Sequence, residues 1–161
     1  MRTTGINRAK IIAKKTGISL NFDIPPQASQ KLFIDPQRLA IALSNLIDNA
    51  IKYNTKNGIV KIRLDNPKES LDTKIIIEDS GVGIPEAEMK NIFQKFYRAS
   101  NITSIAPNGS GLGLYITRNI IKNHGGEIEI ESTEGRGTKF TISLPKDPER
   151  VPREEIIYNT E

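Results

Sequence analysis

Cysteine and tryptophan are absent from the 161 residues, and histidine occurs once, at position 124. Without thiols the chain can form no disulfide, iron–sulfur centre, zinc finger or cysteine nucleophile. A single histidine also makes a His-rich metal site untenable, and a Ser–His–Asp hydrolase could use only His124. The lack of cysteine fits a reducing cytoplasm.

Long hydrophobic runs are also missing: no stretch approaches the ~18 apolar residues of a membrane span, and no signal peptide opens the chain. With 37% hydrophobic and 26% charged residues, the composition is ordinary for one globular domain with its own core. The net charge of +4 is modest. No basic patch with interleaved aromatic residues is present, so no nucleic-acid partner is expected.

The hydrophobic pattern predicts a mixture of helices and strands. Asp35 followed by Pro36 is a strong helix start, with an N-cap and a proline in the first turn. Helices are predicted over 6–15, 35–54, 85–95 and 112–123. Strands are predicted over 18–24, 31–34, 59–65, 73–79, 127–132 and 139–144.

The order of these elements, with two hairpins, predicts an α+β fold. We expect a two-layer α/β sandwich in which a mixed sheet of about five strands is covered on one face by three helices. Residues 1–17 are interpreted as an N-terminal linker with a short helix, 18–146 as the folded domain, and 147–161 as a disordered tail.

The first of four chemical motifs lies on the helix predicted over 35–54. At 3.6 residues per turn, Asn45, Asn49 and Lys52 fall on one narrow stripe, opposite an apolar arc. Asparagine is a mediocre helix former, so two in mid-helix need a reason. Amide oxygens suit Mg²⁺, and a lysine stem can reach a phosphate. A solvated polar face is the competing interpretation.

The second motif, Asp79-Ser80-Gly81-Val82-Gly83-Ile84, follows a strand rich in isoleucine. Glycine lets a ligand approach the backbone closely. An ionised carboxylate only accepts hydrogen bonds, so Asp79 would pair with the 6-amino group of adenine and repel the 6-oxo group of guanine. A plain turn at the end of a strand is the alternative.

The third motif, Phe93-Gln94-Lys95-Phe96-Tyr97-Arg98, precedes a long segment without periodicity, a kind of loop that is usually functional or mobile. Two aromatics three residues apart most often pack into a core, but they could also anchor the loop. Arg98 could place its fork of donors against a terminal phosphate.

The fourth motif, Gly109-Ser110-Gly111-Leu112-Gly113-Leu114, runs into a helix. Backbone N–H groups at a helix N-terminus bind anions, and glycine lets phosphate oxygens reach them. The spacing matches neither the dinucleotide fingerprint nor a P-loop, and a flexible hinge is the alternative. Gly135–Thr138 is interpreted as a hairpin turn, and His124 as a capping or packing residue.

Taken together and in this order, the four motifs resemble the N, G1, F and G2 boxes of the ATP-binding domain of sensor histidine kinases. That family belongs to the gyrase–Hsp90–histidine kinase–MutL group, whose ATP-binding domain has the Bergerat fold. The resemblance extends over residues 18–145.

The resemblance implies that ATP and Mg²⁺ bind at these motifs. Asn45 and Asn49 would bind the metal, and Asn45, Lys52 and Arg98 would be the catalytic residues. The segment 97–110 would form a mobile lid over the nucleotide. The residues implied to contact the nucleotide are Asn45, Asn49, Lys52, Tyr53, Asp79, Gly81, Gly83, Ile84, Phe96, Arg98, Gly109, Ser110, Gly111, Leu112, Gly113, Leu114 and Thr138.

The implied function is transfer of the γ-phosphoryl group of ATP to a histidine on a separate dimerisation domain, with a response regulator downstream. Relatives that hydrolyse ATP carry glutamate at the position of Asn45, where it activates water. Because an amide cannot take up a proton at neutral pH, efficient ATP hydrolysis is not expected. No histidine precedes Ile18, so this chain alone is not expected to autophosphorylate. The isolated domain is expected to be a cytoplasmic monomer, with a parent protein that is often membrane-anchored.

Two other functions stay open. One is a serine protein kinase of the anti-sigma-factor type, or a dehydrogenase kinase of the mitochondrial type. Anti-sigma kinases generally lack the F box, so Phe93–Arg98 favours the histidine kinases. The other is a module that binds nucleotide or docks a partner without activity.

Overall fold

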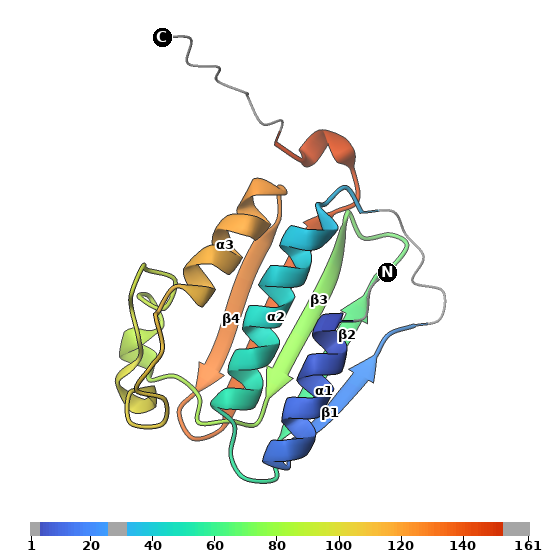
Figure 1. The fold of residues 1–161 in the computed structure, drawn as a ribbon. Helices are drawn as coiled ribbons and strands as arrows, with labels where there is room; N and C mark the ends of the chain where they lie inside the picture. Colours follow the sequence, from blue (N-terminus) through green and yellow to red (C-terminus); the bar gives the residue numbers. More distant parts are fainter. Residues whose placement is uncertain (1–3, 26–31, 153–161) are drawn as a thin grey trace.

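Three α-helices cover one face of a five-stranded sheet in the computed structural model, which describes residues 4–25 and 32–152 (Figure 1). The helices are α1 (Thr4–Thr16), α2 (Pro36–Lys52) and α3 (Gly113–Asn123). The strands are β1 (Ser19–Asp23), β2 (Ile59–Asp65), β3 (Asp72–Asp79), β4 (Glu127–Thr133) and β5 (Gly137–Pro145). The predicted α+β sandwich is confirmed. None of the described helices is long and apolar enough to cross a membrane.

The sheet is mixed, with the strand order β1-β2-β3-β5-β4. β1 and β2 are parallel because α2 carries the chain back across the sheet between them, whereas the other neighbours are antiparallel. The register places Asp79, the last residue of β3, opposite Thr138 near the start of β5. These two predicted site residues therefore lie together at one end of the sheet.

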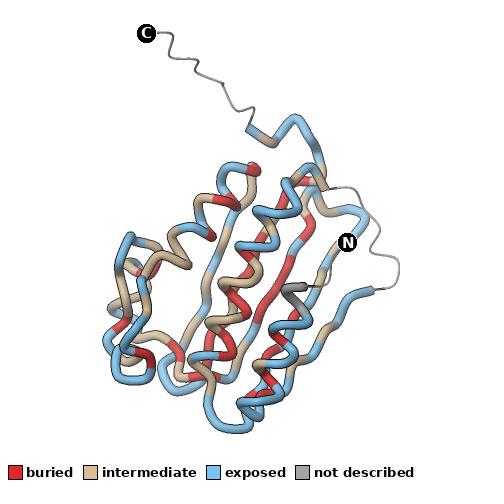
Figure 2. Tube along the Cα trace, viewed as in Figure 1, coloured by how far each residue is buried: buried red, intermediate tan, exposed pale blue. Residues whose placement is uncertain are grey.

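Helix α2 forms as the sequence predicts. The side chain of Asp35 accepts hydrogen bonds from the backbone N–H groups of Gln37 and Arg38, and proline occupies the first turn. The apolar arc packs onto the sheet, and buried positions alternate along α2 with exposed ones on its other side (Figure 2). The buried residues of the arc are Ala42, Leu46, Ile47, Ala50 and Ile51.

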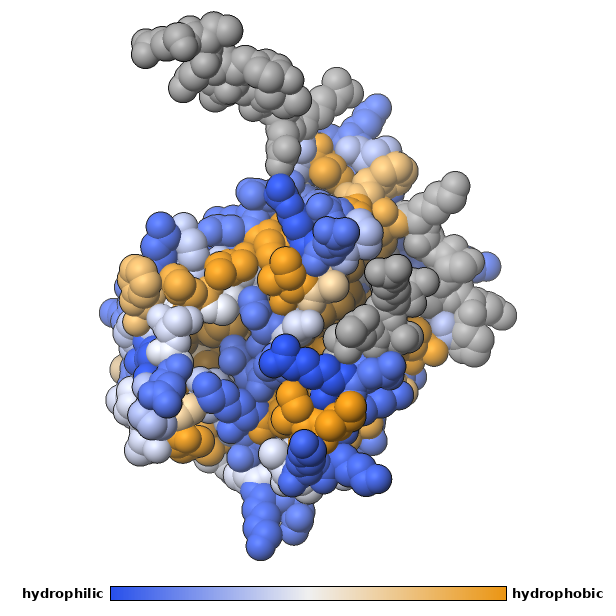
Figure 3. All heavy atoms as spheres, in the orientation of Figure 1, coloured by the Kyte–Doolittle hydropathy of each residue, from blue (hydrophilic) through white to orange (hydrophobic). Residues whose placement is uncertain are grey.

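The third helix of the layer is α1, which contains the short helix predicted over 6–15 within an N-terminal linker. Ala9 and Ala13 are 3% and 2% exposed and belong to the same core as the buried residues of α2. Gly17, with φ +72°, ends the helix as predicted. Hydrophilic residues and groups of apolar ones share the face of the molecule that carries the helices (Figure 3). Ile11 of α1 and Ile41 of α2 are both more than half exposed.

The helix predicted over 85–95 is wrong: only a 3₁₀ turn, Glu86–Glu88, forms there, followed by further turns. The backbone bonds run three residues back, as from Met89 to Glu86 and from Gln94 to Asn91. Tertiary contacts override the local pattern, because the carboxylate of Glu88 and the backbone N–H of Phe96 both bond to the loop that follows.

The short strand predicted over 31–34 is also wrong for residues 32–34, while residue 31 lies outside the described part of the chain. The chain bends at Ile34 because the backbone N–H of Asp35 donates to Nε2 of His124. Nδ1 of His124 bonds to the carbonyl oxygen of Ile120, and the ring is buried. His124 is thus the capping and packing residue that the sequence predicts.

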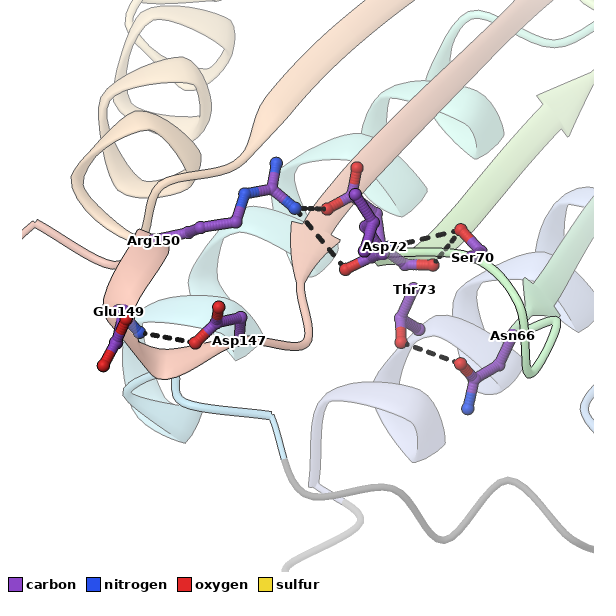
Figure 4. A network of polar contacts seen from close by, with 8 residues as sticks. Asn66, Ser70, Asp72, Thr73, Asp147, Glu149 and Arg150 are labelled. Carbon is purple, nitrogen blue, oxygen red and sulfur yellow. Dashed lines mark hydrogen bonds and ion pairs between the residues drawn. The ribbon is translucent and has the colours of Figure 1, made fainter.

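Residues 146–152 form a C-terminal turn that packs beside the start of β3 (Figure 4). The Arg150 guanidinium lies 2.6 Å from the Asp72 carboxylate, and Asp147 caps the 3₁₀ turn Pro148–Arg150 by accepting from the N–H of Glu149. Disorder was predicted from residue 147 onward, and the order of this turn contradicts it there. The rest of the predicted tail, 153–161, lies outside the described residues.

Candidate functional site

A cavity of about 230 Å³ lies where the C-terminal half of α2, the end of β3, the loop 97–111 and the start of α3 meet. It brings together thirteen of the predicted site residues: Asn49, Lys52, Tyr53, Asp79, Gly83, Ile84, Arg98, Gly109, Ser110, Gly111, Gly113, Leu114 and Thr138. Asn49 and Asp79 therefore face one shared space, although 30 residues of sequence separate them.

Asp79 forms the acidic corner of the cavity. Its Oδ1 accepts a hydrogen bond of 2.8 Å from the backbone N–H of Gly81. Burial raises the pKa of this carboxyl to about 6, although backbone N–H groups of Gly81 and Thr138 oppose the rise. At neutral pH Asp79 is therefore mostly ionised, and it can accept a hydrogen bond from an amino group inside a partly apolar cavity.

A short polar network holds the loop after Asp79 against the last hairpin. Ser132 Oγ accepts from the backbone N–H of Ile84 at 2.9 Å and bonds to the Thr138 hydroxyl at 3.0 Å. Gly83 adopts φ +65°, and a Cβ there would lie 2.1 Å from the carbonyl oxygen of Thr133. Only glycine allows this approach, so the second glycine of the motif is required by the fold.

The opposite end of the cavity suits an anion. The N-terminus of α3 has no side-chain cap, and the glycines before and at its start, Gly109, Gly111 and Gly113, line the cavity. Arg98 lines the same region. Its Nη1 donates to the carbonyl oxygen of Pro107 at 2.8 Å, and its Nη2 donates to that of Ala106.

Helix α2 contributes the residues between these two ends. Asn49 and Lys52 line the cavity from its polar side. Asn45, one turn earlier, does not line it. Instead its Nδ2 donates to the carbonyl oxygen of Gly113 at 3.3 Å and to the Thr117 hydroxyl at 3.4 Å. The amide nitrogen of Asn45 is therefore engaged in hydrogen bonds with α3.

The sequence profile of a family described as histidine kinase-, DNA gyrase B-, and HSP90-like ATPases matches residues 34–148. The chain belongs to this family.

The relatives of this domain include a sensor protein and a sensor histidine kinase. It is 39% identical over 125 residues to the sensor protein GacS of Pseudomonas syringae pv. syringae, an alignment that covers 76% of the chain and 14% of GacS. It is 36% identical over 117 residues to the sensor histidine kinase WalK of Bacillus subtilis, covering 73% of the chain and 19% of WalK. The chain thus spans less than a fifth of the length of these two relatives.

The fold agrees with solved structures of the same family. The catalytic domain of histidine kinase ThkA superposes with a TM-score of 0.73 and 29% identity, over 92% of this chain and 94% of that domain. The predicted resemblance to the ATP-binding domain of sensor histidine kinases is confirmed.

Four predicted residues of this ATPase domain do not line the cavity. Asn45 is covered by α3, as described above. Gly81 lies behind Asp79, where a Cβ would meet the backbone oxygen of Tyr53 at 2.5 Å. Leu112 occupies the N-cap of α3, and its N–H faces the Ser110 hydroxyl.

Phe96 is the clearest correction, because its side chain is 70% exposed and contacts neither core nor cavity. Its backbone has φ +63° and packs against Gly111, whose carbonyl oxygen accepts the N–H of Phe96. A Cβ on Gly111 would lie 2.6 Å from the carbonyl carbon of Phe96. This close contact between two backbones turns the ring outward.

Sequence reasoning missed the apolar walls of the cavity and the hydroxyl of Ser132. The missed wall residues are Ala50, Val82, Ile92, Tyr97, Ala99, Ile102 and Phe140. Phe140 could have been found from the inward alternation of its strand, but only with the register that pairs it with Ile77. Val82 and Tyr97 lie within the second and third motifs, and Ala99 and Ile102 lie in the predicted lid, but these patterns gave no reason to assign their side chains to the cavity wall.

The side chains that could act as ligands indicate which metal ion the domain could bind. No group of three or more His, Asp or Glu side chains within residues 4–25 and 32–152 could bind a metal ion by itself. A lone amide such as Asn49 suits Mg²⁺, which keeps waters and takes most other ligands from substrate phosphates. The residues present therefore fit magnesium only as a companion of a bound polyphosphate.

Proposed function

We propose that this domain binds Mg-ATP and presents the γ-phosphoryl group to a histidine on a separate dimerisation domain. One observation carries the proposal: a single cavity joins an acidic corner at Asp79 to the uncapped, glycine-rich N-terminus of α3. WalK is named as a sensor histidine kinase and GacS as a sensor protein, but both are much longer than this chain. The activity of the whole protein therefore belongs to the proposal.

Each end of the cavity recognises one part of the nucleotide. The Asp79 carboxylate accepts from the 6-amino group of adenine, while Gly83, Ile84 and Thr138 surround the base. Lys52 and Tyr53 contact phosphate or ribose. At the other end, the backbone N–H groups of α3 and the donors of Arg98 hold the phosphate oxygens.

Asn49 supplies the protein ligand to magnesium, which neutralises charge on the phosphates when it is bound. The Nδ2 of Asn45 bonds to Gly113 and Thr117. Asn45 can therefore be a second ligand to magnesium only through its Oδ1, if that oxygen points toward the phosphates. Phosphoryl transfer needs mainly alignment and charge stabilisation, which these residues provide. No carboxylate stands at Asn45 to activate water, so ATP hydrolysis is slow.

The phosphate acceptor is not His124. Both of its ring nitrogens are engaged, with Ile120 and Asp35, and the side chain is buried at the end of α3. Since this is the only histidine of the sequence, the acceptor lies on another polypeptide segment. A response regulator then receives the phosphoryl group, and we place the domain in the cytoplasm.

Calorimetric titration with Mg-ATP tests the first half of the proposal. We expect saturable binding by the wild type, much weaker binding by Asp79→Asn, and preference for ATP over GTP. Absence of any binding by the folded wild type would overturn the proposal.

Transfer is tested by adding a separate histidine-bearing dimerisation domain and [γ-³²P]ATP. Acid-labile label on the added domain is the expected result. Acid-stable label would indicate a serine kinase instead, and binding without any transfer would indicate a module without activity.

A further inference from the structure

The root of the lid segment 97–110 is fastened by a side chain that none of the four motifs contains. Glu88, at the end of the 3₁₀ turn Glu86–Glu88, accepts hydrogen bonds from two lid residues. The Tyr97 hydroxyl donates to its Oε2 at 2.8 Å, and the backbone N–H of Ser100 donates to the same oxygen at 2.9 Å. The Ser100 hydroxyl donates to the other oxygen, Oε1.

Three donors around one carboxyl favour its ionised form, and the direction of the pKa shifts agrees. The hydrogen bonds from Ser100 and then from Tyr97 hold the pKa of Glu88 below its usual range. The same carboxylate raises the pKa of the Tyr97 hydroxyl. At neutral pH Glu88 therefore only accepts, and the donors on both sides of it are satisfied together.

A second contact ties the same part of the lid to the loop below the base. Nδ2 of Asn101 donates to the carbonyl oxygen of Gly83 at 3.0 Å. Arg98 also contacts the outer part of the lid, through the carbonyl oxygens of Ala106 and Pro107. The backbone N–H of Ala106 bonds in addition to the carbonyl oxygen of Ile102. The lid is thus fastened at its root by Glu88 and Asn101, and Arg98 connects that root to its outer part.

Arg98 lies between the two residues that Glu88 holds. Tyr97 is held directly before Arg98 and Ser100 two residues after it, so the backbone of Arg98 is constrained from both sides. Its side chain lines the cavity and donates to the carbonyl oxygens of Ala106 and Pro107. We propose that Glu88 is a positioning residue for Arg98, which fixes the arginine so that its donors meet the terminal phosphate of a nucleoside triphosphate. This inference rests on the proposed function, in which Arg98 binds that phosphate.

The competing interpretation is that Glu88 only stabilises the fold. If Glu88 only stabilised the fold, its loss would weaken the binding of all nucleotides equally, or of none. If Glu88 acts through Arg98, its loss affects contacts to the γ-phosphate. Binding of a triphosphate would then be weaker, and binding of a diphosphate would be unchanged. The two interpretations therefore predict different ratios of affinities.

The matched control is Glu86, an exposed glutamate in the same turn whose side chain forms no hydrogen bond or ion pair with the described residues. Glu86→Ala and Glu88→Ala remove the same charge two residues apart. Glu88→Gln and Tyr97→Phe serve as milder variants, since they remove some of the bonds and keep the side-chain volume. Thermal unfolding establishes that each variant is folded.

Calorimetry is then performed with Mg-AMP-PNP and with Mg-ADP. For Glu88→Ala we expect about tenfold weaker binding of Mg-AMP-PNP and less than about twofold for Mg-ADP, the size of one charge-assisted contact. Glu86→Ala should match the wild type for both. In an Arg98→Ala background, Glu88→Ala should have no further effect.

Equal loss for both nucleotides, an unchanged Mg-AMP-PNP affinity, or additive effects with Arg98→Ala would each overturn the positioning role. Failure of the wild type to bind either nucleotide would instead refute the proposed function, so the two failures are distinguishable.

Discussion

At the scale of single residues, Asp79 combines two opposing demands. The cavity needs its charge to recognise an amino group, yet burial makes that charge unfavourable and raises the pKa to about 6. The backbone N–H of Gly81 offsets part of the cost. A recognition residue of this kind is expected to reduce stability at the pH where it functions.

The substitution Asp79→Asn should therefore stabilise the fold above pH 6. The pKa of the folded state is higher than the unfolded value of 3.8, so the wild type loses stability as pH rises from about 4 to about 6. A shift of about two pKa units corresponds to at most about 3 kcal/mol. Urea denaturation of both proteins at pH 4 and pH 8 checks this. A difference in unfolding free energy that does not grow with pH would contradict it.

The titration of Asp79 should also respond to ligand. Adenine donates its amino group to the ionised form, so Mg-ADP should lower the pKa from about 6 in the free protein. Carboxyl ¹³C shifts measured across pH, with and without Mg-ADP, test this directly. If the pKa stayed the same in saturating nucleotide, Asp79 would not contact the base.

At the scale of elements, hydrogen bonds connect α2 and α3 at two places, one near the cavity and one away from it. Near the cavity, Asn45 of α2 bonds to Gly113 and Thr117 of α3. Away from it, His124 connects the end of α3 to Asp35, the N-cap of α2. The two helices that present the polar side of the cavity are therefore held by polar contacts in addition to apolar packing.

Replacing His124 by alanine should lower the unfolding free energy by about 2 kcal/mol, because a buried ring and two hydrogen bonds are lost. Asn123→Ala is the matched control, since Asn123 is exposed on the same turn. Urea denaturation measures both. Equal effects of the two substitutions would show that the connection between the helices contributes nothing.

At the scale of the whole molecule, the cavity and the C-terminal turn lie at opposite ends of β3. Asp79 faces the cavity, whereas Asp72 bonds to Arg150 of the turn. They lie seven positions apart along the strand, about 23 Å at the usual rise. A Cβ on Gly125 would lie 2.2 Å from the backbone oxygen of Arg150, so the turn packs closely on the domain.

Deleting residues 147–161 should therefore affect stability but not nucleotide binding. The Arg150–Asp72 pair is partly exposed, so we expect a loss of about 1 kcal/mol in unfolding free energy. The dissociation constant of Mg-ADP should stay within about twofold of the wild type, because β3 keeps its other contacts. Calorimetry and urea denaturation test both parts. A large loss of affinity would mean that the turn acts on the cavity.

Several elements follow from local signals in the amino-acid sequence. Asp35-Pro36 fixed the start of α2, alternation fixed β2 at Ile59–Asp65, and the glycine-rich motifs marked both ends of the cavity. The family also followed from the order of the four motifs. These features depend on caps, periodicity and backbone freedom, which neighbouring residues decide.

Tertiary structure alone decided features that depend on contacts between distant segments. No α-helix forms over 85–95, where Glu88 bonds to Ser100 instead. Phe96 points outward because its backbone packs against Gly111, and Asn45 bonds to α3. Tertiary structure also added α1 to the core. In each case a hydrogen bond or close contact between separate segments outweighs local propensities of less than about 1 kcal/mol per residue, and the sequence pattern does not record such contacts.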